Sequence, residues 1–125
     1  MALAELEYIG GGGGNAKSDT FTSPTNASLS INVGFKPKKL AVYFTGSTES
    51  SVGSGLIAWV YDEDYMGTTK FLKITRSGTS YTGAVSDFDE SNSNTLVSID
   101  DNGFTVKTNT NTAFTAKEWH YIAVG

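Results

Sequence analysis

The sequence predicts an all-β fold: a single antiparallel β-sandwich or jelly-roll-like domain over residues 29–125, preceded by an extended N-terminal arm over residues 1–28. The first observation behind this prediction is composition, since 52 of the 125 residues are Thr, Ser, Asn or Gly. These residue types disfavour long helices, because the polar side chains compete for backbone hydrogen bonds and Gly loses more entropy on ordering. The second is the alternation of apolar and polar residues in short segments, and the third is the turn-forming residues between them.

Seven segments alternate in the manner of strands, and a fold of seven or eight short strands is typical of a sandwich. Segment 55–62 is apolar on both faces, which predicts a central strand. In segment 70–76 we expect Leu72 and Ile74 on the buried face and Phe71 opposite. The segments are 29–33, 39–45, 55–62, 70–76, 96–99, 104–107 and 119–124.

Two short polar segments are typical of hairpin turns. Ser77-Gly78-Thr79 is a candidate for a tight hairpin. Asp101-Asn102-Gly103 contains Asn-Gly, a strong hairpin signal because both residues tolerate positive φ.

The first 28 residues differ from the rest, because they show no clear period and include five consecutive glycines. We interpret them as an arm that docks on a neighbouring chain, with a disordered tail or linker as the alternative. Apolar side chains would anchor the arm and the glycines would let its backbone pass close to the neighbour. The partner-binding residues predicted on this basis are Leu3, Leu6, Tyr8, Ile9, Gly10, Gly11, Gly12, Gly13 and Gly14.

Composition also argues against several classes of function. The chain has no Cys and a single His, His120, so neither a thiol nucleophile nor a site with several His ligands is available. A net charge of −4 and a pI near 4.8 argue against nucleic-acid binding. No apolar run approaches the length of a membrane span, and no Gly-x-Ser-x-Gly elbow is present. We therefore expect no enzyme activity, no catalytic residues, no cofactor, no bound metal and no membrane insertion.

The acidic residues Asp87, Asp89 and Glu90 suggest calcium as an alternative to a solvated loop. In a helix–loop–helix calcium site beginning at Asp87, the sixth residue would be Gly and the twelfth Glu. Here those positions hold Asn92 and Ser98. The pattern fails, and a solvated acidic loop is the favoured interpretation.

Three segments together carry a resemblance to known proteins. They are Val33-Gly34-Phe35-Lys36-Pro37-Lys38-Lys39-Leu40-Ala41-Val42-Tyr43, Ile99-Asp100-Asp101-Asn102-Gly103-Phe104-Thr105-Val106 and Trp119-His120-Tyr121-Ile122-Ala123-Val124-Gly125. This order resembles small β modules in tailed-bacteriophage structural proteins of tails, fibres and head appendages. A looser resemblance is to the H-type lectin domain, a β-sandwich that assembles as trimers or hexamers and binds N-acetylgalactosamine. The motifs shape strands and turns, so they imply a fold more directly than a binding site.

The resemblance leads to two functional hypotheses. The first is a non-enzymatic phage virion protein, a head decoration, appendage or tail-associated subunit, located in the virion as a homo-oligomer, expected to be a trimer, and attached to other virion proteins through its arm. The second is a lectin-like module that recognises a cell-surface glycan, because aromatic rings stack on sugar faces. The candidate glycan-binding residues are Trp59, Tyr61, Tyr65, His120 and Tyr121. For His120, a partly buried position beside core aromatics is the simpler interpretation.

Overall fold

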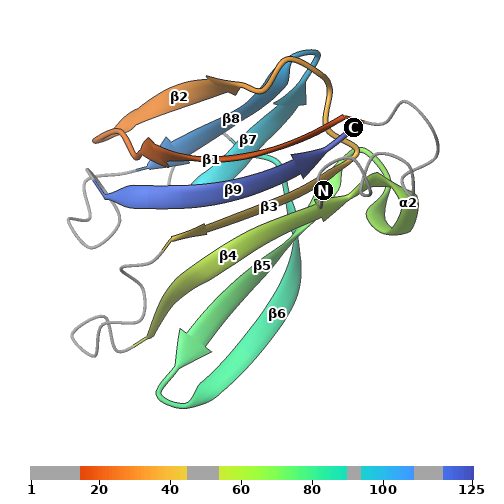
Figure 1. Cartoon of the computed structure of the whole chain (residues 1–125). Helices are drawn as coiled ribbons and strands as arrows, with labels where there is room; N and C mark the ends of the chain where they lie inside the picture. Colours follow the sequence, from red (N-terminus) through yellow and green to blue (C-terminus); the bar gives the residue numbers. More distant parts are fainter. Residues whose placement is uncertain (1–14, 45–53, 90–93, 109–116) are drawn as a thin grey trace, which may run out of the picture.

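Nine strands and one single-turn helix make up the part of the chain that the computed structural model describes, residues 15–44, 54–89, 94–108 and 117–125 (Figure 1). The N-terminal half contains β1 (Ala16–Thr22), β2 (Ala27–Asn32), β3 (Lys39–Phe44), β4 (Ser54–Asp62) and the helix α2 (Glu63–Met66). The C-terminal half contains β5 (Lys70–Ser77), β6 (Ser80–Asp87), β7 (Thr95–Asp100), β8 (Gly103–Thr108) and β9 (Glu118–Val124).

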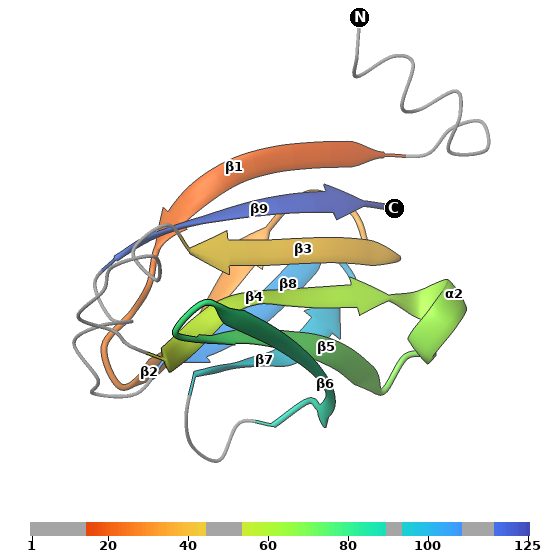
Figure 2. The same cartoon turned by 90° about the horizontal axis from the view of Figure 1, so that it is seen from below.

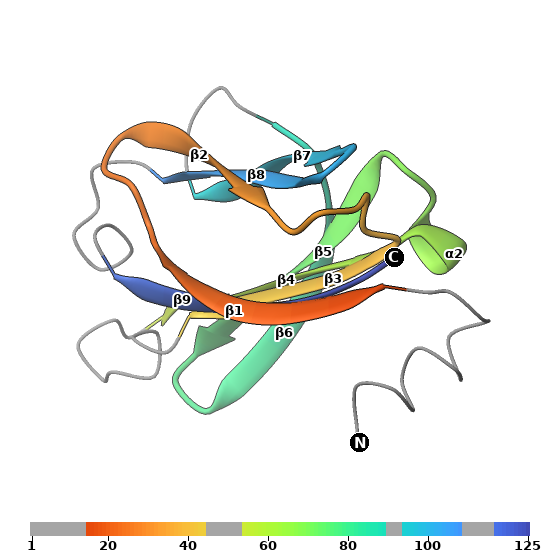
Figure 3. The same ribbon diagram turned by 45° about the horizontal axis from the view of Figure 1, so that its top comes forward.

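The strands form two antiparallel sheets that pack face to face, so the predicted all-β sandwich is confirmed (Figure 3). The larger sheet has the strand order β1-β9-β3-β4-β5-β6, and the smaller has the order β2-β8-β7. Figure 2 shows the strands of the larger sheet side by side in this order. The segment that is apolar on both faces forms β4, which lies inside the larger sheet with β3 and β5 as neighbours. A central place for it is therefore confirmed.

Aromatic side chains fill the space between the sheets. Trp59 of β4 and Trp119 of β9 are buried with ring centroids 4.7 Å apart. Phe104 of β8 meets Tyr121 of β9 edge-on at 5.2 Å, which joins the small sheet to the large one. Edge-to-face and offset pairs of this kind contribute beyond their buried area. Residues alternate along β9, and its buried face carries Trp119, Tyr121 and Ala123.

The predicted arm is too long at its C-terminal end. Residues Ala16–Thr22 form β1, which pairs with β9 along its whole length, from Ala16 opposite Val124 to Thr22 opposite Glu118. Phe21 contacts the core and lies 5.8 Å from Trp119 between ring centroids. The sandwich therefore includes β1 and the following β2, and its first strand begins at Ala16 instead of near residue 29.

Two assignments in the β5–β6 hairpin are corrected by the structure. The sequence pattern predicts no strand over Ser80–Asp87, which forms β6. The predicted face of β5 is reversed, because Phe71 is fully buried whereas Leu72 and Ile74 are only half-buried. Phe71 packs against Phe88 at 5.3 Å between ring centroids. The Phe71 ring therefore faces the core, and the side chains of Leu72 and Ile74 do not.

Both predicted hairpins form, although the turn of one has a different backbone conformation from the one predicted. Gly78 has φ of 61° in the two-residue loop between Ser77 and Ser80, a conformation that glycine adopts at little cost. In the second hairpin Asp100 pairs with Gly103, so the loop is Asp101-Asn102, and neither residue has positive φ. Gly103 is required for another reason, because a Cβ there would lie 1.8 Å from the backbone oxygen of Ile31.

Candidate interaction surface

The outward-facing side chains of the six-stranded sheet form apolar rows that cross the strands. The register places Ile122 of β9 opposite Ala41 of β3, and Ala41 opposite Val60 of β4. Val60 lies opposite Leu72 of β5, and Leu72 opposite Val85 of β6. Opposed residues of antiparallel strands share one face and touch. Ile122 is 44% and Val85 64% exposed at the two ends of this row. We call the side of the sheet that carries it the outer face.

A second row runs beside the first along the same five strands. It places His120 of β9 opposite Tyr43, Tyr43 opposite Ala58, Ala58 opposite Ile74, and Ile74 opposite Gly83. The rings of Tyr43 and His120 stack with centroids 5.5 Å apart and planes within 11°. Tyr43 is 38% exposed. The outer face therefore combines a broad apolar area with one accessible aromatic pair.

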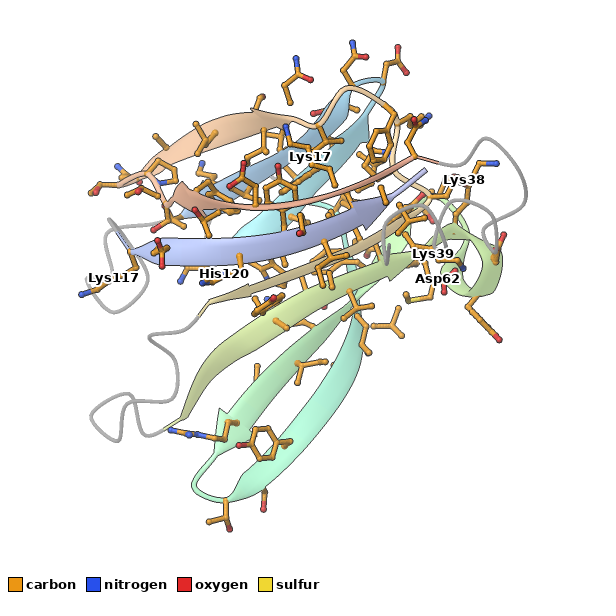
Figure 4. The ribbon with its side chains drawn as sticks, in the orientation of Figure 1. Lys17, Lys38, Lys39, Asp62, Lys117 and His120 are labelled. Atoms are coloured by element: carbon orange, nitrogen blue, oxygen red, sulfur yellow. The ribbon has the colours of Figure 1, made fainter. Side chains whose placement is uncertain are left out.

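Charged side chains border the outer face at the α2 end of the sheet. Figure 4 shows Lys39 and Asp62 side by side there, and the Lys39 Nζ donates to Asp62 Oδ1 at 2.9 Å and to Asp64 Oδ2 at 3.1 Å. The hydrogen bond from Lys39 lowers the pKa of Asp62, and the bonds to the two carboxylates raise the pKa of Lys39. Lys70 forms a second ion pair with Asp87 between β5 and β6. Both ion pairs lie at the α2 end, beside the first apolar row, and combine opposite charges, so the apolar rows remain the distinctive feature of the outer face.

The outward side of the three-stranded sheet has the opposite character. Asp100 accepts hydrogen bonds from Ser98 Oγ at 2.6 Å and from Thr105 Oγ1 at 2.7 Å. Thr105 in turn shares a hydrogen bond with Ser30 of β2 at 3.0 Å between their hydroxyl oxygens. Side chains of this kind prefer water to apolar contact. The sandwich thus presents one polar sheet face and one apolar sheet face.

Three of the five predicted glycan-binding residues belong to the core. Trp59, Tyr61 and Tyr121 are 0%, 1% and 3% exposed. Their rings lie between the two sheets, and burial raises the pKa of both tyrosines. A sugar stacks on an accessible ring face, so the prediction of a sugar contact is wrong for these three residues. They alternate with outward-facing neighbours, and the sequence does not say which face of a two-sided apolar strand meets solvent.

The other two predicted glycan-binding residues are accessible but do not lie together. Tyr65 is 88% exposed on α2, which directly follows β4. His120 pairs with Tyr43, four positions along β3 from Lys39, and Lys39 pairs with Asp62 at the start of α2. Four strand positions correspond to about 13 Å. Figure 4 shows His120 toward the end of β9 that is remote from α2. These two residues therefore do not form one aromatic site.

The predicted arm residues, from Leu3 to Gly14, lie outside the described residues. The sequence pattern does not predict the outer face as a surface, because it places Leu72 and Ile74 on a buried face and predicts no strand around Val85. The available signal was the apolar character of segment 55–62 on both faces, which fits an exposed interaction face as well as a second buried layer. The residues concerned are Ala41, Val60, Leu72, Ile74, Val85 and Ile122.

Comparisons with protein-family profiles, with curated proteins and with solved structures give no match to this chain. In the part of the chain that the structure describes, no helix is long and apolar enough to span a membrane. Within the same residue ranges, no three His, Asp or Glu side chains come together as a metal site. The two unlike sheet faces and the sequence itself are therefore the guides to function.

Proposed function

We propose that this protein is a non-enzymatic structural subunit of a tailed-bacteriophage virion, a head decoration, appendage or tail-associated protein. The outer face of the six-stranded sheet lies against a neighbouring virion protein, and the N-terminal arm adds a second contact. The polar face of the three-stranded sheet is directed to solvent.

The observation that carries this proposal is the apolar outer face. Water contact with apolar surface costs about 25 cal/mol per Å². A continuous apolar row from Ile122 to Val85 is therefore unfavourable unless a partner covers it, and large exposed apolar patches mark interaction surfaces. Val60 and Leu72 lie on the side of the sheet away from the core between the two sheets, so a partner on this side would bury apolar surface that the fold leaves partly exposed.

The virion assignment is supported by the resemblance of three sequence segments to phage structural modules. The arm supports it as well, because Leu3, Leu6, Tyr8 and Ile9 can offset the ordering cost of a flexible segment when they become buried. Three of the five residues proposed for glycan binding are buried in the core, and the other two, Tyr65 and His120, do not lie together. The described residues therefore give the glycan alternative no support. Binding on a glycan array that is lost in His120→Ala would restore it.

Incorporation into particles tests the outer face. Mass spectrometry of purified particles made from the genome that encodes the chain is expected to find the protein. Ile122→Lys places a charge in the apolar row without touching the core and is expected to reduce incorporation at least about tenfold. Ser30→Lys, on the polar sheet face, is the matched control and is expected to incorporate normally. Normal incorporation of Ile122→Lys would overturn the proposal that this face is the attachment surface.

A second variant tests the arm separately. Deletion of residues 1–14 leaves β1 intact and is expected to give a folded protein that incorporates poorly. Purified particles that contain this truncated protein at the normal level would remove the arm from the proposal, while the outer-face test would still stand.

A further inference from the structure

The edge of the six-stranded sheet that β6 forms lacks the features that protect exposed strand edges. No described segment pairs with this edge. Natural proteins usually protect such edges with charges, Pro, bulges or short strands, because unpaired backbone groups invite another strand. The eight residues of β6 contain no Pro and no Lys or Arg, and the one charged residue, Asp87, stands at the end of the strand in an ion pair with Lys70. Tyr81 and Val85 are each 64% exposed.

The opposite edge of the same sheet is protected. On β1, Lys17 lies opposite Ala123 and Asp19 opposite Tyr121, so both charged residues are on the face that points toward the small sheet. Both are exposed. Inward-pointing charges on an edge strand are a recognised device against edge-to-edge pairing. The two edges of one sheet therefore differ, and only β6 is open to a further strand.

The hairpin geometry defines which backbone groups of β6 are available. A two-residue hairpin loop is closed by a hydrogen-bonded pair, here Ser77 and Ser80 around Gly78-Thr79. Hydrogen-bonded and non-hydrogen-bonded pairs alternate along an antiparallel ladder. The N–H and C=O groups of Tyr81, Gly83 and Val85 therefore point away from β5, toward the open edge.

We propose that β6 pairs in antiparallel fashion with β6 of a second copy of this chain, around a two-fold axis at Gly83. In this register Gly83 faces Gly83 of the second copy, and Tyr81 faces Val85 of the second copy. The symmetry repeats the second contact, so two aromatic–aliphatic pairs flank the axis. Such cross-strand pairs stabilise antiparallel sheets, and each available backbone group finds a partner.

Other registers lose this complementarity. A shift by one residue places an outer-face side chain opposite one from the other face. A shift by two residues places Tyr81 opposite either Gly83 or Asp87 of the second copy. Only the axis at Gly83 matches the two exposed apolar side chains with each other.

The same register makes the apolar outer faces of two copies continuous. In each copy the first row ends at Val85, which meets Tyr81 of the second copy. The second row ends at Gly83, which meets the same residue across the axis. The occupant of the edge is therefore inferred to be a second copy, because the edge is complementary to itself in both hydrogen bonding and side chains. A two-fold contact forms a dimer, in contrast to the trimer that the sequence resemblance implies.

Sedimentation equilibrium of the full chain tests the pairing. The wild-type protein is expected to dimerise, and Tyr81→Lys is expected to raise the dimer dissociation constant at least about tenfold. Tyr65→Lys, the same change at an exposed tyrosine of α2, is the control and is expected to leave dimerisation unchanged. Circular dichroism and the thermal midpoint show whether each variant is folded. A wild-type monomer, or a dimer or trimer that is insensitive to Tyr81→Lys, overturns the proposal.

Disulfide trapping tests the register, since the chain has no native Cys. Hydrogen-bonded pairs have Cα atoms about 5.5 Å apart, within the range that a disulfide spans. Gly83→Cys is expected to cross-link with itself. Tyr81→Cys and Val85→Cys are each expected to stay uncross-linked alone and to form a heterodimer when mixed. Cross-linking of Tyr81→Cys alone as fast as the mixture overturns the axis at Gly83.

The proposed virion function and this contact can fail separately. A monomer in solution that still enters particles would refute the contact and support the virion function. A dimer of the proposed register that is absent from particles would support the contact and refute the virion function.

Discussion

At the scale of single residues, Asp62 shows how one side chain serves two local structures. It ends β4 with extended backbone geometry, φ −141° and ψ 104°, and its carboxylate accepts the backbone N–H of Asp64 at 3.0 Å. This is the N-cap of α2, where Asp and Asn are among the favoured residues. The same carboxylate binds Lys39, which lies opposite it on β3. The sequence shows an acidic cluster here but not its partner, because the Lys39–Asp62 contact depends on the pairing of two strands.

Substitution of Asp62 separates these two roles. Asp62→Ala loses both and is expected to lower the free energy of unfolding by about 1 kcal/mol. Asp62→Asn keeps a capping oxygen and is expected to cost less, since exposed ion pairs contribute about 0–1 kcal/mol. Urea unfolding at neutral pH measures both values. Equal losses in the two variants would show that the cap contributes nothing.

The lowered pKa of Asp62 gives this contribution a pH dependence. A carboxyl group whose pKa is lower in the folded state stabilises the protein above its unfolded pKa, about 3.9, and that contribution is lost as the pH falls through the folded pKa. Asp62→Asn is therefore expected to reduce the decline in stability below about pH 4. Urea midpoints at several acidic pH values check this, and identical profiles for the two proteins would contradict it.

Trp59 tests the assignment of the predicted sugar-binding rings to the core. It is fully buried against Trp119, and Trp59→Ala is expected to cost about 3–5 kcal/mol of unfolding free energy. Tyr65→Ala removes an aromatic ring that is 88% exposed and is expected to change stability by less than about 0.5 kcal/mol. Chemical denaturation of both variants makes the comparison. Similar small effects would mean that Trp59 is not a core residue.

At the scale of elements, the sequence predicts strands well where apolar and polar residues contrast. Alternation in β3 and β9 identifies each strand and separates its two faces, and the structure places Leu40 and Val42 inside and Ile122 outside. The sequence pattern does not predict β1 and β6, because Ser and Thr occupy many of their positions and leave little contrast between apolar and polar residues. The face of β5 could not be predicted, because Phe71 and Leu72 are both apolar and only the packed second sheet distinguishes them.

Truncation from the N-terminus tests the corrected boundary of the sandwich. Deletion of residues 1–14 is expected to change the free energy of unfolding by less than about 0.5 kcal/mol. Deletion of residues 1–22 removes β1 and the Phe21 ring from Trp119 and Tyr121. It is expected to cost at least about 3 kcal/mol. Thermal and urea unfolding measure the stability of both truncated proteins. Equal stability would show that β1 belongs to the arm and not to the sandwich.

At the scale of the whole molecule, the fold class could be predicted and the candidate surface could not. Composition and turns suffice for an antiparallel sandwich, because they decide between helix and strand locally. The outer face depends on register, since Ile122, Ala41 and Val60 become one surface only when β9, β3 and β4 are aligned. The sequence records each of these residues as apolar in a strand. It does not show that the three-stranded sheet covers only one face of the six-stranded sheet.

The ends of the described chain provide a test of the complete topology. Ala16 lies opposite Val124, and the Gly125 N–H donates to the Asn15 C=O at 2.8 Å, so β1 and β9 end side by side. A two-residue Asn-Gly loop is the usual connection for such a pair. A circular permutant that joins Gly125 to Asn15 through this loop, and opens at Gly78–Thr79, is therefore expected to keep the sandwich.

The permutant exchanges one hairpin closure for another, and loop closure costs change slowly with length. Its free energy of unfolding is expected to lie within about 2 kcal/mol of that of the chain without residues 1–14. A cooperative urea transition and the near-ultraviolet circular dichroism of the Trp59–Trp119 pair check that the core is intact. Loss of either signal would contradict the pairing of β1 with β9 as the closing step of the larger sheet, because every other strand contact remains available to the permuted chain.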